Sequence, residues 1–561
     1  MRTIKYYVML VLALSSCSIR YDDAIEYVDS ASIVSQELNA DSISLYSAAA
    51  LRVWNETSWK RSYDNKTFFE YVLPPYVASE PVEYYWRNDI PKKLHVNTDE
   101  DISVLASRIN NAVYVNLSTN TYGNAMLGYS RAMDGTIGKC NDRSMLLTMA
   151  LRAYGIPSSY DEIPYWGSNN NGHTATSVVL PDDRLLVFQN VGDRGDSAIF
   201  ANKIPKVFSR RYSILKDELY RHRDKASIPE FFKDFRKEDV TGRYPINSTD
   251  VVLDVSKEYD GELAYLAVFS PEGWVVVDYS EIRRGEVKFD DVGTGVSCWG
   301  VNPVAGDYIG EGIIYLPCIY VDRRIEPLHD VILVSDSGVE SVHPDKENRI
   351  TVSLTRKYPL LNRIKGYVSQ MNSGVFECAD DPDFSDATIM FRVADAKPYM
   401  QSRAVDYEAQ YVRYRKSRGD FSIAEIQVKD NMGNELESDV FVEEFMKDLP
   451  DLQSVSDGNP LTYLTLPASI DTWVGLKLKR RERIGTVEFA PRNDDNNIIP
   501  GQMYELFYWE GKWISLGKQV AEDYEILYDE VPEGALLWLC NLSTGREERP
   551  FLYKNGKQVW F

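Results

Sequence analysis

Residues 138–157 read GKCNDRSMLLTMALRAYGIP and predict a helix that carries a cysteine in its first turn. Apolar residues recur on one helical face, at Met145, Leu146, Met149, Ala150 and Ala153. Gly155 suits the position just after a helix, and Pro157 cannot continue one. We therefore expect a helix of about three and a half turns that begins at Cys140.

Cys140 stands where a nucleophilic cysteine works, because the positive end of a helix stabilises a thiolate. A cysteine nucleophile also needs a base. Residues 171–180 (NGHTATSVVL) place His173 at the start of a strand. The turn at 181–183 (PDD) leads into a second strand, 184–189 (RLLVFQ). The pattern is a helix that starts with Cys, followed by a hairpin that starts with His.

This pattern resembles the transglutaminase-like fold, a relative of the papain-type cysteine proteases, over residues 25–245. The matching words are GKC at 138–140, LRAYGIP at 151–157 and GHT at 172–174. The words FFEYVLP at 68–74 and YWR at 85–87 resemble a subfamily found in lipoproteins of gut Bacteroidetes. The resemblance implies that Cys140 is the nucleophile and His173 its base. It also implies acyl transfer at an amide bond, as crosslinking, deamidation, peptide hydrolysis or de-N-glycosylation.

The chain departs from that family pattern at two places. The family carries an aromatic residue just after the His, where this chain has Thr-Ala at 174–175. It also carries an Asp near the end of the second strand, where this chain has Gln189 and Asn190. Either amide can accept the imidazole N–H but supplies no negative charge, so we expect a weak site. A bond from Asp193 or Asp196 to the His would instead restore a full triad.

The N-terminal residues predict the location of the protein. Basic residues precede a short apolar run, 6–14, which is too short to span a bilayer as a mature helix. The word LSSC at 14–17 resembles the bacterial lipobox, whose Cys is lipidated after cleavage. We expect Cys17 to anchor the protein in the bacterial cell envelope, at the outer membrane, facing the periplasm or the surface. The alternative is a plain secretory signal with an incidental Cys.

The sequence becomes strand-like from about residue 246. Examples are VVLDV at 251–255 and LAYLAV at 263–268, with Gly, Pro and Asp turns between such runs. We expect a multidomain α+β protein, with an α+β domain at 25–245, a β-sandwich at 246–345 and further sandwiches beyond. One short helix is expected at 440–446.

The C-terminal part resembles the discoidin domain, a jelly-roll sandwich with a galactose-binding-like fold. The matching words are DGNPLT at 457–462, WVGL at 473–476, PR at 491–492 and YEL at 504–506. A stretch at 374–384 resembles another part of the same family. The resemblance therefore implies that residues 346–445 and 446–561 form two such sandwiches, or one with an unusual order. The resemblance implies loops that bind sugars, and sometimes lipids or a structural Ca²⁺.

Four residues are candidates for ligand binding in this part. Arg492, Asn493 and Asp495 are polar residues gathered in a turn. Trp509 suits stacking on a sugar, or packing in the strand core, which is the blander alternative. Apart from a structural Ca²⁺, no cofactor is expected, and the pairs 380–381 and 494–495 (both Asp-Asp) are read as turn residues that could also hold that ion.

Composition excludes some classes of function. The 561 residues hold 62 Lys plus Arg and 84 Asp plus Glu, so a net charge of −22 argues against nucleic-acid binding. The six Cys are too few for a disulfide framework, and those in strand-like contexts predict core packing: Cys298, Cys318, Cys378 and Cys540.

Two functions remain. One is a lipid-anchored enzyme whose Cys–His site acts on amide bonds of peptides or glycopeptides. The alternative is a surface lipoprotein that binds glycans or proteins through a degenerate, non-catalytic domain.

Overall fold

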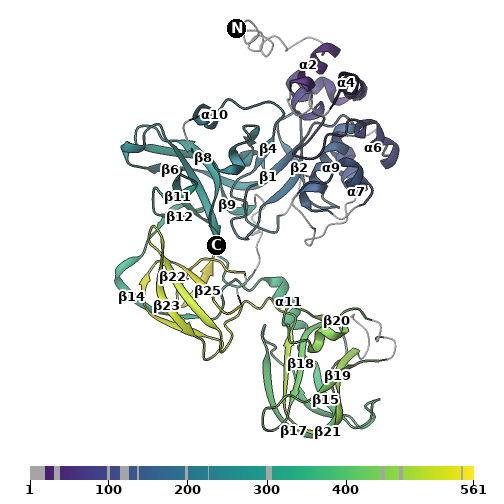
Figure 1. Cartoon of the computed structure of the whole chain (residues 1–561), viewed down its shortest axis with the longest axis vertical. Coiled ribbons are helices and arrows are strands. Elements are labelled where there is room, and N and C mark those ends of the chain that lie inside the picture. Colours follow the sequence, from purple (N-terminus) through teal and green to yellow (C-terminus); the bar gives the residue numbers. More distant parts are fainter. Residues whose placement is uncertain are drawn as a thin grey trace. The chain divides into compact units, whose positions relative to one another are not determined.

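The computed structural model describes most of the chain, and the described residues form two compact units (Figure 1). The structure describes residues 19–30, 38–97, 101–113, 125–135, 138–195, 200–224, 227–297, 306–443, 446, 449–466, 472–544 and 547–561. The first unit is Met1–Val304, Glu311–Val342 and Phe561, and the second is Ala305–Gly310 and His343–Trp560. Cys17, Asp196 and Cys298 lie outside the described residues. Among the described helices, none is long and apolar enough to cross a membrane.

The first part of the first unit consists of helices and an antiparallel sheet. The helices are α2 (Tyr21–Asp29), α4 (Ala40–Glu56), α5 (Asn65–Thr67), the π-helix η2 (Phe68–Val72), α6 (Trp86–Leu94), α7 (Ile102–Ala112), α8 (Tyr129–Met133), α9 (Cys140–Ala153) and α10 (Glu218–His222). The strands are β1 (Ser158–Ile163), β2 (His173–Val179), β3 (Leu185–Phe188), β4 (Phe208–Arg210) and β5 (Lys237–Asp239), in the order β3-β2-β1-β4-β5. Helix α9 packs directly on β1 and β2.

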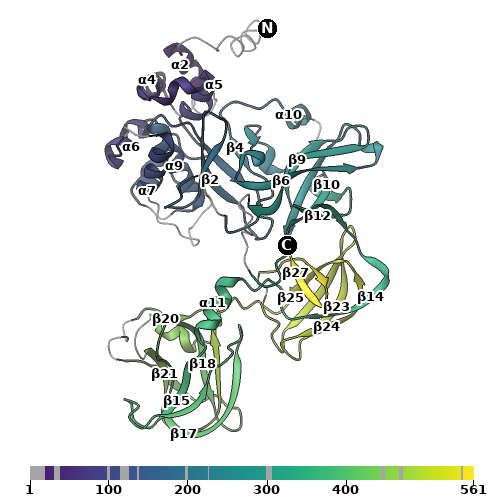
Figure 2. The same cartoon turned by 180° about the vertical axis from the view of Figure 1, so that it is seen from behind.

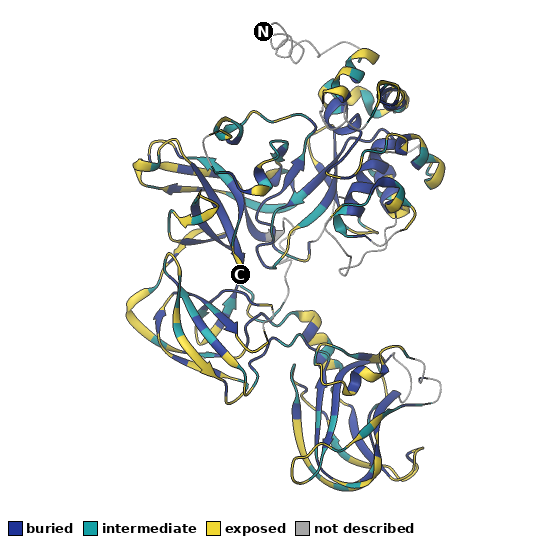
Figure 3. Ribbon diagram, viewed as in Figure 1, coloured by how far each residue is buried: buried dark blue, intermediate teal, exposed yellow. Residues whose placement is uncertain are grey.

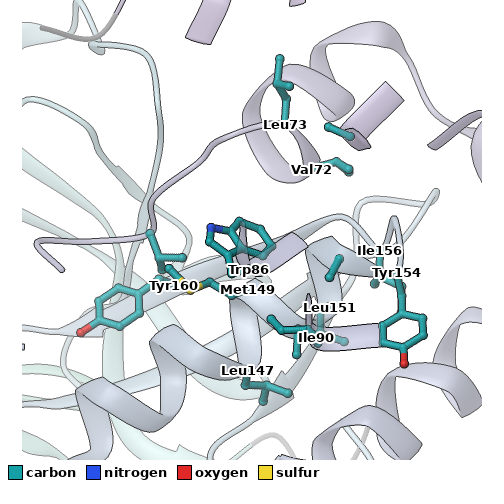
Figure 4. Close-up of a cluster of buried hydrophobic side chains, with 14 of the residues drawn as sticks. Val72, Leu73, Trp86, Ile90, Leu147, Met149, Leu151, Tyr154, Ile156 and Tyr160 are labelled. Atoms are coloured by element: carbon teal, nitrogen blue, oxygen red, sulfur yellow. The ribbon is translucent and has the colours of Figure 1, made fainter. Parts of the chain in front are cut away.

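The structure confirms the predicted helix at its start and its end. Helix α9 begins at Cys140, and Gly155 beyond it has a φ of +72°, a left-handed conformation that glycine adopts without strain. Every residue from Asp142 to Ala153 is buried (Figure 3), so the helix is covered on all sides rather than on one face. Its side chains Leu147, Met149 and Leu151 belong to the cluster in Figure 4, which also holds Val72, Trp86, Ile90 and Tyr160.

The upstream segments FFEYVLP (68–74) and YWR (85–87) hold neighbouring elements of this fold together. Residues Phe68–Val72 form a buried π-helical turn. The buried guanidinium of Arg87 donates to the carbonyl oxygens of Val72 and Arg152, both at 2.5 Å. It thereby ties η2 to the last turn of α9. The carboxylate of Glu70 accepts from the hydroxyl of Tyr27 at 2.8 Å and from the backbone N–H of Tyr212 at 3.0 Å.

The rest of the first unit consists of β-strands, as the strand-like sequence from residue 246 predicts. A long pair consists of β6 (Ile246–Asp254) and β9 (Glu286–Ser297). A second sheet has the order β13-β12-β10-β7-β8, with β11 paired to β10. Its strands are β7 (Leu263–Ser270), β8 (Gly273–Glu281), β10 (Ile313–Val321), β11 (Arg324–Pro327), β12 (Val331–Ser335) and β13 (Gly338–Val342). One apolar cluster, which includes Val251, Leu266 and Tyr315, draws on both strand groups.

The second unit contains two β-cores. One sheet has the order β16-β15-β17-β21-β18-β20, with β19 paired to β21, and another has the order β23-β22-β25-β26-β27. A separate pair joins β14 to β24. The elements are β14 (Asp345–Leu354), α11 (Asn362–Gln370), β15 (Val375–Ala379), β16 (Thr388–Arg392), β17 (Gln401–Lys416), β18 (Phe421–Lys429), β19 (Ser438–Phe441), β20 (Leu464–Leu466), β21 (Thr472–Pro491), β22 (Met503–Trp509), β23 (Trp513–Val520), β24 (Ile526–Glu533), β25 (Leu536–Asn541), β26 (Phe551–Lys554) and β27 (Lys557–Trp560).

The sheet order differs from two expectations drawn from the sequence. Strand β17 pairs with β21 from Gln401↔Phe489 to Lys416↔Thr472, so the expected boundary at 445/446 falls within a single sheet. Strand β14 instead pairs with β24 near the C-terminus. The short helix expected at 440–446 begins as strand β19, because Val440 and Phe441 pair with Leu476 and Gly475 of β21. The fold is a multidomain α+β protein with a large β-rich part.

Candidate active site around Cys140

Cys140 is the first residue of α9 and a free, partly exposed thiol. The carboxylate of Asp142 fixes this end of the helix, accepting the backbone N–H of Lys139 and that of Leu127, each at 2.7 Å. From Asp142 onward every residue of the helix is buried. The thiol therefore sits at the accessible end of a buried helix, which is the positive end of the helix dipole.

His173 is the first residue of β2, as the sequence predicts, and pairs with Ile163 of β1. Its ring stacks on that of Trp166, with centroids 5.2 Å apart and an angle of 26° between the planes. Its Nε2 is buried and has no hydrogen-bond partner among the described residues. Burial, followed by the nearby guanidinium of Arg143, lowers the pKa of His173 to about 4. The ring is therefore neutral at physiological pH.

The alternation of side chains along β2 turns Thr174 toward α9. The hydroxyl of Thr174 donates to that of Ser144 at 3.3 Å, and that of Thr176 donates to the Ser144 carbonyl oxygen at 3.0 Å. Ala175 instead packs in the cluster that contains Trp166, on the opposite face of the sheet. Because alternate residues share a face, His173 starts on the Trp166 side.

The contact between Ser144 and Thr174 nevertheless brings the start of α9 next to the start of β2. The buried hydroxyl of Tyr160, on β1, belongs to the same region. Burial, the charge of Glu162 and the charge of Cys140 all raise the pKa of Tyr160, well above its usual range. Among the described residues, no hydrogen bond joins Cys140 to His173, so their direct pairing stays a prediction.

The two amides expected beside His173 lie just after β3, which ends at Phe188. The carboxylate of Asp193 accepts the backbone N–H groups of Gln189 and Asn190, both at 2.8 Å. Arg143 donates to the carbonyl oxygen of Gln189 at 3.3 Å. These contacts fix the loop backbone, and none of them reaches His173. The third member of the site therefore also stays a prediction.

The sequence analysis did not predict two residues that surround His173: Trp166, which stacks on its ring, and Arg143, which lowers its pKa. Trp166 lies in the loop between β1 and β2, where its backbone N–H donates to the carbonyl oxygen of Asn171 at 2.8 Å and its ring lies over His173. Arg143 lies three residues after Cys140, hence on the same face of the helix, which was a readable signal. Its guanidinium also donates to the side-chain oxygen of Asn110 at 2.6 Å.

The C-terminal ligand candidates fall in two places. Arg492 and Asn493 follow β21, and the Arg492 guanidinium lies between the rings of Tyr367 and Tyr463, 3.8 and 3.7 Å from their centroids. Asn493 is buried and donates to the carbonyl oxygen of Pro491 at 2.8 Å. Both side chains thus have structural partners in the folded chain.

The other two candidates are also held in the fold. Asp495 has a φ of +51°, and its N–H donates to the side-chain oxygen of Asn493 at 2.9 Å, as in a tight turn. Trp509 ends β22, in a different sheet from β21, and is buried edge-to-face against Trp513 at 5.1 Å. This packing matches the blander of the two interpretations of Trp509, and the structure does not bring it into the turn at 492–495.

The expected metal sites and core cysteines can be examined within the described residues. There, no group of three or more His, Cys, Asp and Glu could hold a metal ion. Asp380 accepts from Arg481 at 2.9 Å, and Asp494 accepts from Arg356 at 2.6 Å. The three cysteines in strands that the structure describes are buried and free, as predicted: Cys318, Cys378 and Cys540.

Comparisons with known proteins leave the family open. No family model matches the chain, and no curated protein matches it. A solved structure described as a putative cysteine protease from Cytophaga hutchinsonii is 15% identical over 21% of this chain and 40% of that one, with a TM-score of 0.18. The aligned part therefore spans less than half of that protease. The transglutaminase of red sea bream is 8% identical over 88% of this chain and 70% of that one, with a TM-score of 0.11. Scores this low establish neither a shared fold nor a shared family.

Proposed function

We propose that the protein is a cysteine-dependent acyl-transfer enzyme that acts on amide bonds of peptides or glycopeptides. The observation that carries the proposal is a partly exposed thiol at the start of a buried helix that packs on strand β2, whose first residue is His173 with a buried, unbonded Nε2. An unbonded nitrogen in a buried ring is costly unless it serves a bound group. The neutral form of His173 is the form that can accept a proton.

In the proposed reaction, the sulfur of Cys140 attacks the amide carbonyl while Nε2 of His173 takes the thiol proton. The carbon–nitrogen bond breaks, the amine leaves with that proton, and a thioester remains on Cys140. Water or a second amine then takes the acyl group and regenerates the thiol. His173 must reach the thiol directly or through one water molecule when substrate binds, since catalytic hydrogen bonds tighten in the substrate complex.

Alkylation of Cys140 by iodoacetamide across pH tests this proposal. The background is favourable, since burial raises the pKa of Cys318 and of Cys378, the latter to about 11. Burial raises the pKa of Cys540 as well. A Cys298→Ser change removes a cysteine that lies outside the described residues, and Cys140→Ser gives the blank. We expect Cys140 to react several-fold faster than a free thiol at about pH 7 and to lose this advantage in His173→Gln.

The alternative function is a surface lipoprotein with a non-catalytic domain. Two observations favour it: Thr174 faces α9, and no described carboxylate is bonded to His173. Under this alternative, Cys140 reacts at the rate of a free thiol and His173→Gln has no effect.

We further propose that Cys17 carries the lipid anchor in the cell envelope. The support is the basic start, the short apolar run and the word LSSC at 14–17. A Cys17→Ala change should release the protein from the membrane fraction. Unchanged fractionation would contradict the anchor without bearing on Cys140.

A further inference from the structure

Trp166 covers one face of the His173 imidazole in the loop that joins β1 to β2. The two rings are stacked, with centroids 5.2 Å apart and an angle of 26° between their planes. Trp166 is itself only 5% exposed, and it belongs to an apolar cluster that also contains Ile163 and Phe200. Because the indole is packed in place, the stack limits the rotation of the imidazole about its side-chain bonds.

The backbone of this loop holds both rings in position. The N–H of Trp166 donates to the carbonyl oxygen of Asn171 at 2.8 Å, which closes the loop just before β2 begins. A Cβ atom at Gly172 would lie only 2.8 Å from the carbonyl oxygen of Pro164, so glycine allows the chain to approach itself closely just before His173. The backbone is therefore fixed on both sides of the stack.

Within the part of the chain that the structure describes, no hydrogen bond at Nε2 orients the imidazole. Strand β2, which begins with His173, lies beside α9 (Figure 2), and from that helix the guanidinium of Arg143 acts on the ring through its charge. From β1, the residue paired with His173 is the apolar Ile163. The orientation of the ring therefore depends on what packs against its face, which is the indole of Trp166.

We infer that Trp166 is a positioning residue, which holds the plane of the His173 imidazole and shields the ring from water. The inference rests on the proposed function, because His173 is the base of that reaction. A base whose plane is fixed keeps its nitrogen in one direction, so less freedom is lost when the substrate binds. Trp166 acts through His173 and takes no part in the making or breaking of bonds.

The indole has two opposite effects on the protonation of His173. An aromatic face attracts a cation and favours the imidazolium, whereas the exclusion of water favours the neutral ring. Burial is the larger cause of the low pKa of His173, ahead of the charge of Arg143. Loss of the indole should therefore raise the pKa of His173 from about 4 toward its ordinary value of about 6.5.

NMR of the full chain with isotope-labelled histidines tests the inference. The chain has five His, and His173→Gln identifies the resonances of His173. In the unmodified chain, the indole should shift the ring protons of His173 upfield. Trp166→Leu should abolish that shift and raise the pKa of His173, whereas Trp166→Phe, which keeps an aromatic face, should retain most of the shift and the low pKa. Phe200→Leu, in the same cluster, is the matched control and should leave the pKa near 4.

Ring protons of His173 without an upfield shift in the unmodified chain would overturn the inference, whether or not a variant folds. An unchanged pKa of His173 in a folded Trp166→Leu chain would also overturn it. Alkylation of Cys140 at about pH 5.5 separates the inference from the proposed function, because a protonated His173 cannot act as a base there. If the pKa rises in Trp166→Leu but the alkylation rate does not fall several-fold, the positioning role stands and the proposed reaction is wrong.

Discussion

At the residue scale, the central feature is the buried, neutral imidazole of His173, on the strand that packs against the helix of Cys140. The low pKa of His173 has two causes, burial and the guanidinium of Arg143, and neither depends on the thiol. A thiolate or a carboxylate at the ring would act in the opposite direction and favour the imidazolium. The proposed reaction therefore starts from a neutral imidazole, which takes the thiol proton as the sulfur attacks the substrate.

The first prediction is that His173 titrates near pH 4 in the folded protein. Proton NMR of the imidazole resonances, assigned with His173→Gln, measures it directly. Between pH 4 and about 6.5 the unfolded chain binds one more proton than the folded one, so the free energy of unfolding should rise with pH across this window. His173→Gln should flatten that rise. Titration above pH 6.5 would show that an anion faces the ring.

The second prediction concerns Glu425, a buried carboxyl in β18 that lies beside Asp457. Burial, followed by the neighbouring carboxylate of Asp457, raises the pKa of Glu425 to about 7. The folded chain thus holds a proton that the unfolded chain has lost, and stability falls as pH rises from about 4.5 to 7. Glu425→Gln should raise the free energy of unfolding by about 1 kcal/mol above pH 7 and leave it unchanged near pH 4.5.

Urea unfolding at both pH values provides the measurement for Glu425. The exposed Glu437→Gln is the matched control and should behave like the unmodified chain. Equal effects of Glu425→Gln at both pH values would contradict the raised pKa.

At the element scale, α9 is the part of the fold that the sequence specifies best. Local residues determine where this helix begins and ends. A cap precedes the apolar residues, and Gly155 and Pro157 follow them. Its full burial could not be predicted, because Arg152 contacts Tyr76 and strand β1, and Thr148 contacts strand β2, rather than solvent. Tertiary contacts satisfy their polar atoms, and a periodicity argument does not see such contacts.

The sequence pattern also could not predict on which side of strand β2 the His173 side chain lies. The word GHTATSVV predicts the strand, and the pairing of β2 with β3 confirms the hairpin. Whether His173 or Thr174 points at α9 depends on a shift of one residue, which exchanges the two faces of a strand. Pairing with β1 decides this register, and β1 carries no signal that a single sequence could reveal.

The third prediction tests the cap of α9. Asp142→Ala removes the acceptor of two backbone N–H groups, those of Lys139 and Leu127. Loss of a cap that also bridges a loop should lower the free energy of unfolding by about 2 kcal/mol. Chemical denaturation measures the change, with the exposed Asp254→Ala as control. A change no larger than that of the control would mean that the cap is not needed.

At the scale of the whole molecule, the second unit contains a β-core inserted within another. One apolar cluster includes Ile364, Val412 and Phe489, and the other includes Leu354, Ile498 and Trp560. The chain leaves the outer core after β14 and returns at about residue 498. The two ends of the insert meet at a bridge between Arg356 and Asn497.

Short sequence motifs could not predict this insertion, because a motif gives the position of residues along the chain but not the sheet to which a strand belongs. The words at 457–462 and 504–506 resemble one family, yet they lie in segments that the sheet order assigns to different cores. Long-range pairing of β14 with β24 leaves no local trace in either strand.

The fourth prediction follows from the separate cores. Residues 356–497 expressed alone should fold, since their cluster is complete and their ends meet. Cooperative thermal unfolding and dispersed NMR resonances would confirm a folded fragment. A fragment without a cooperative transition would show that the insert depends on the outer core.

The most direct test of the central claim is acylation of Cys140 by p-nitrophenyl acetate, followed by mass spectrometry of the cysteine-containing peptides. The account predicts that one acetyl group appears on Cys140 as a thioester and then turns over. It predicts no such adduct in Cys140→Ser and slower formation in His173→Gln. Acetylation of Cys140 no faster than that of a free thiol, and unchanged by His173→Gln, would contradict it.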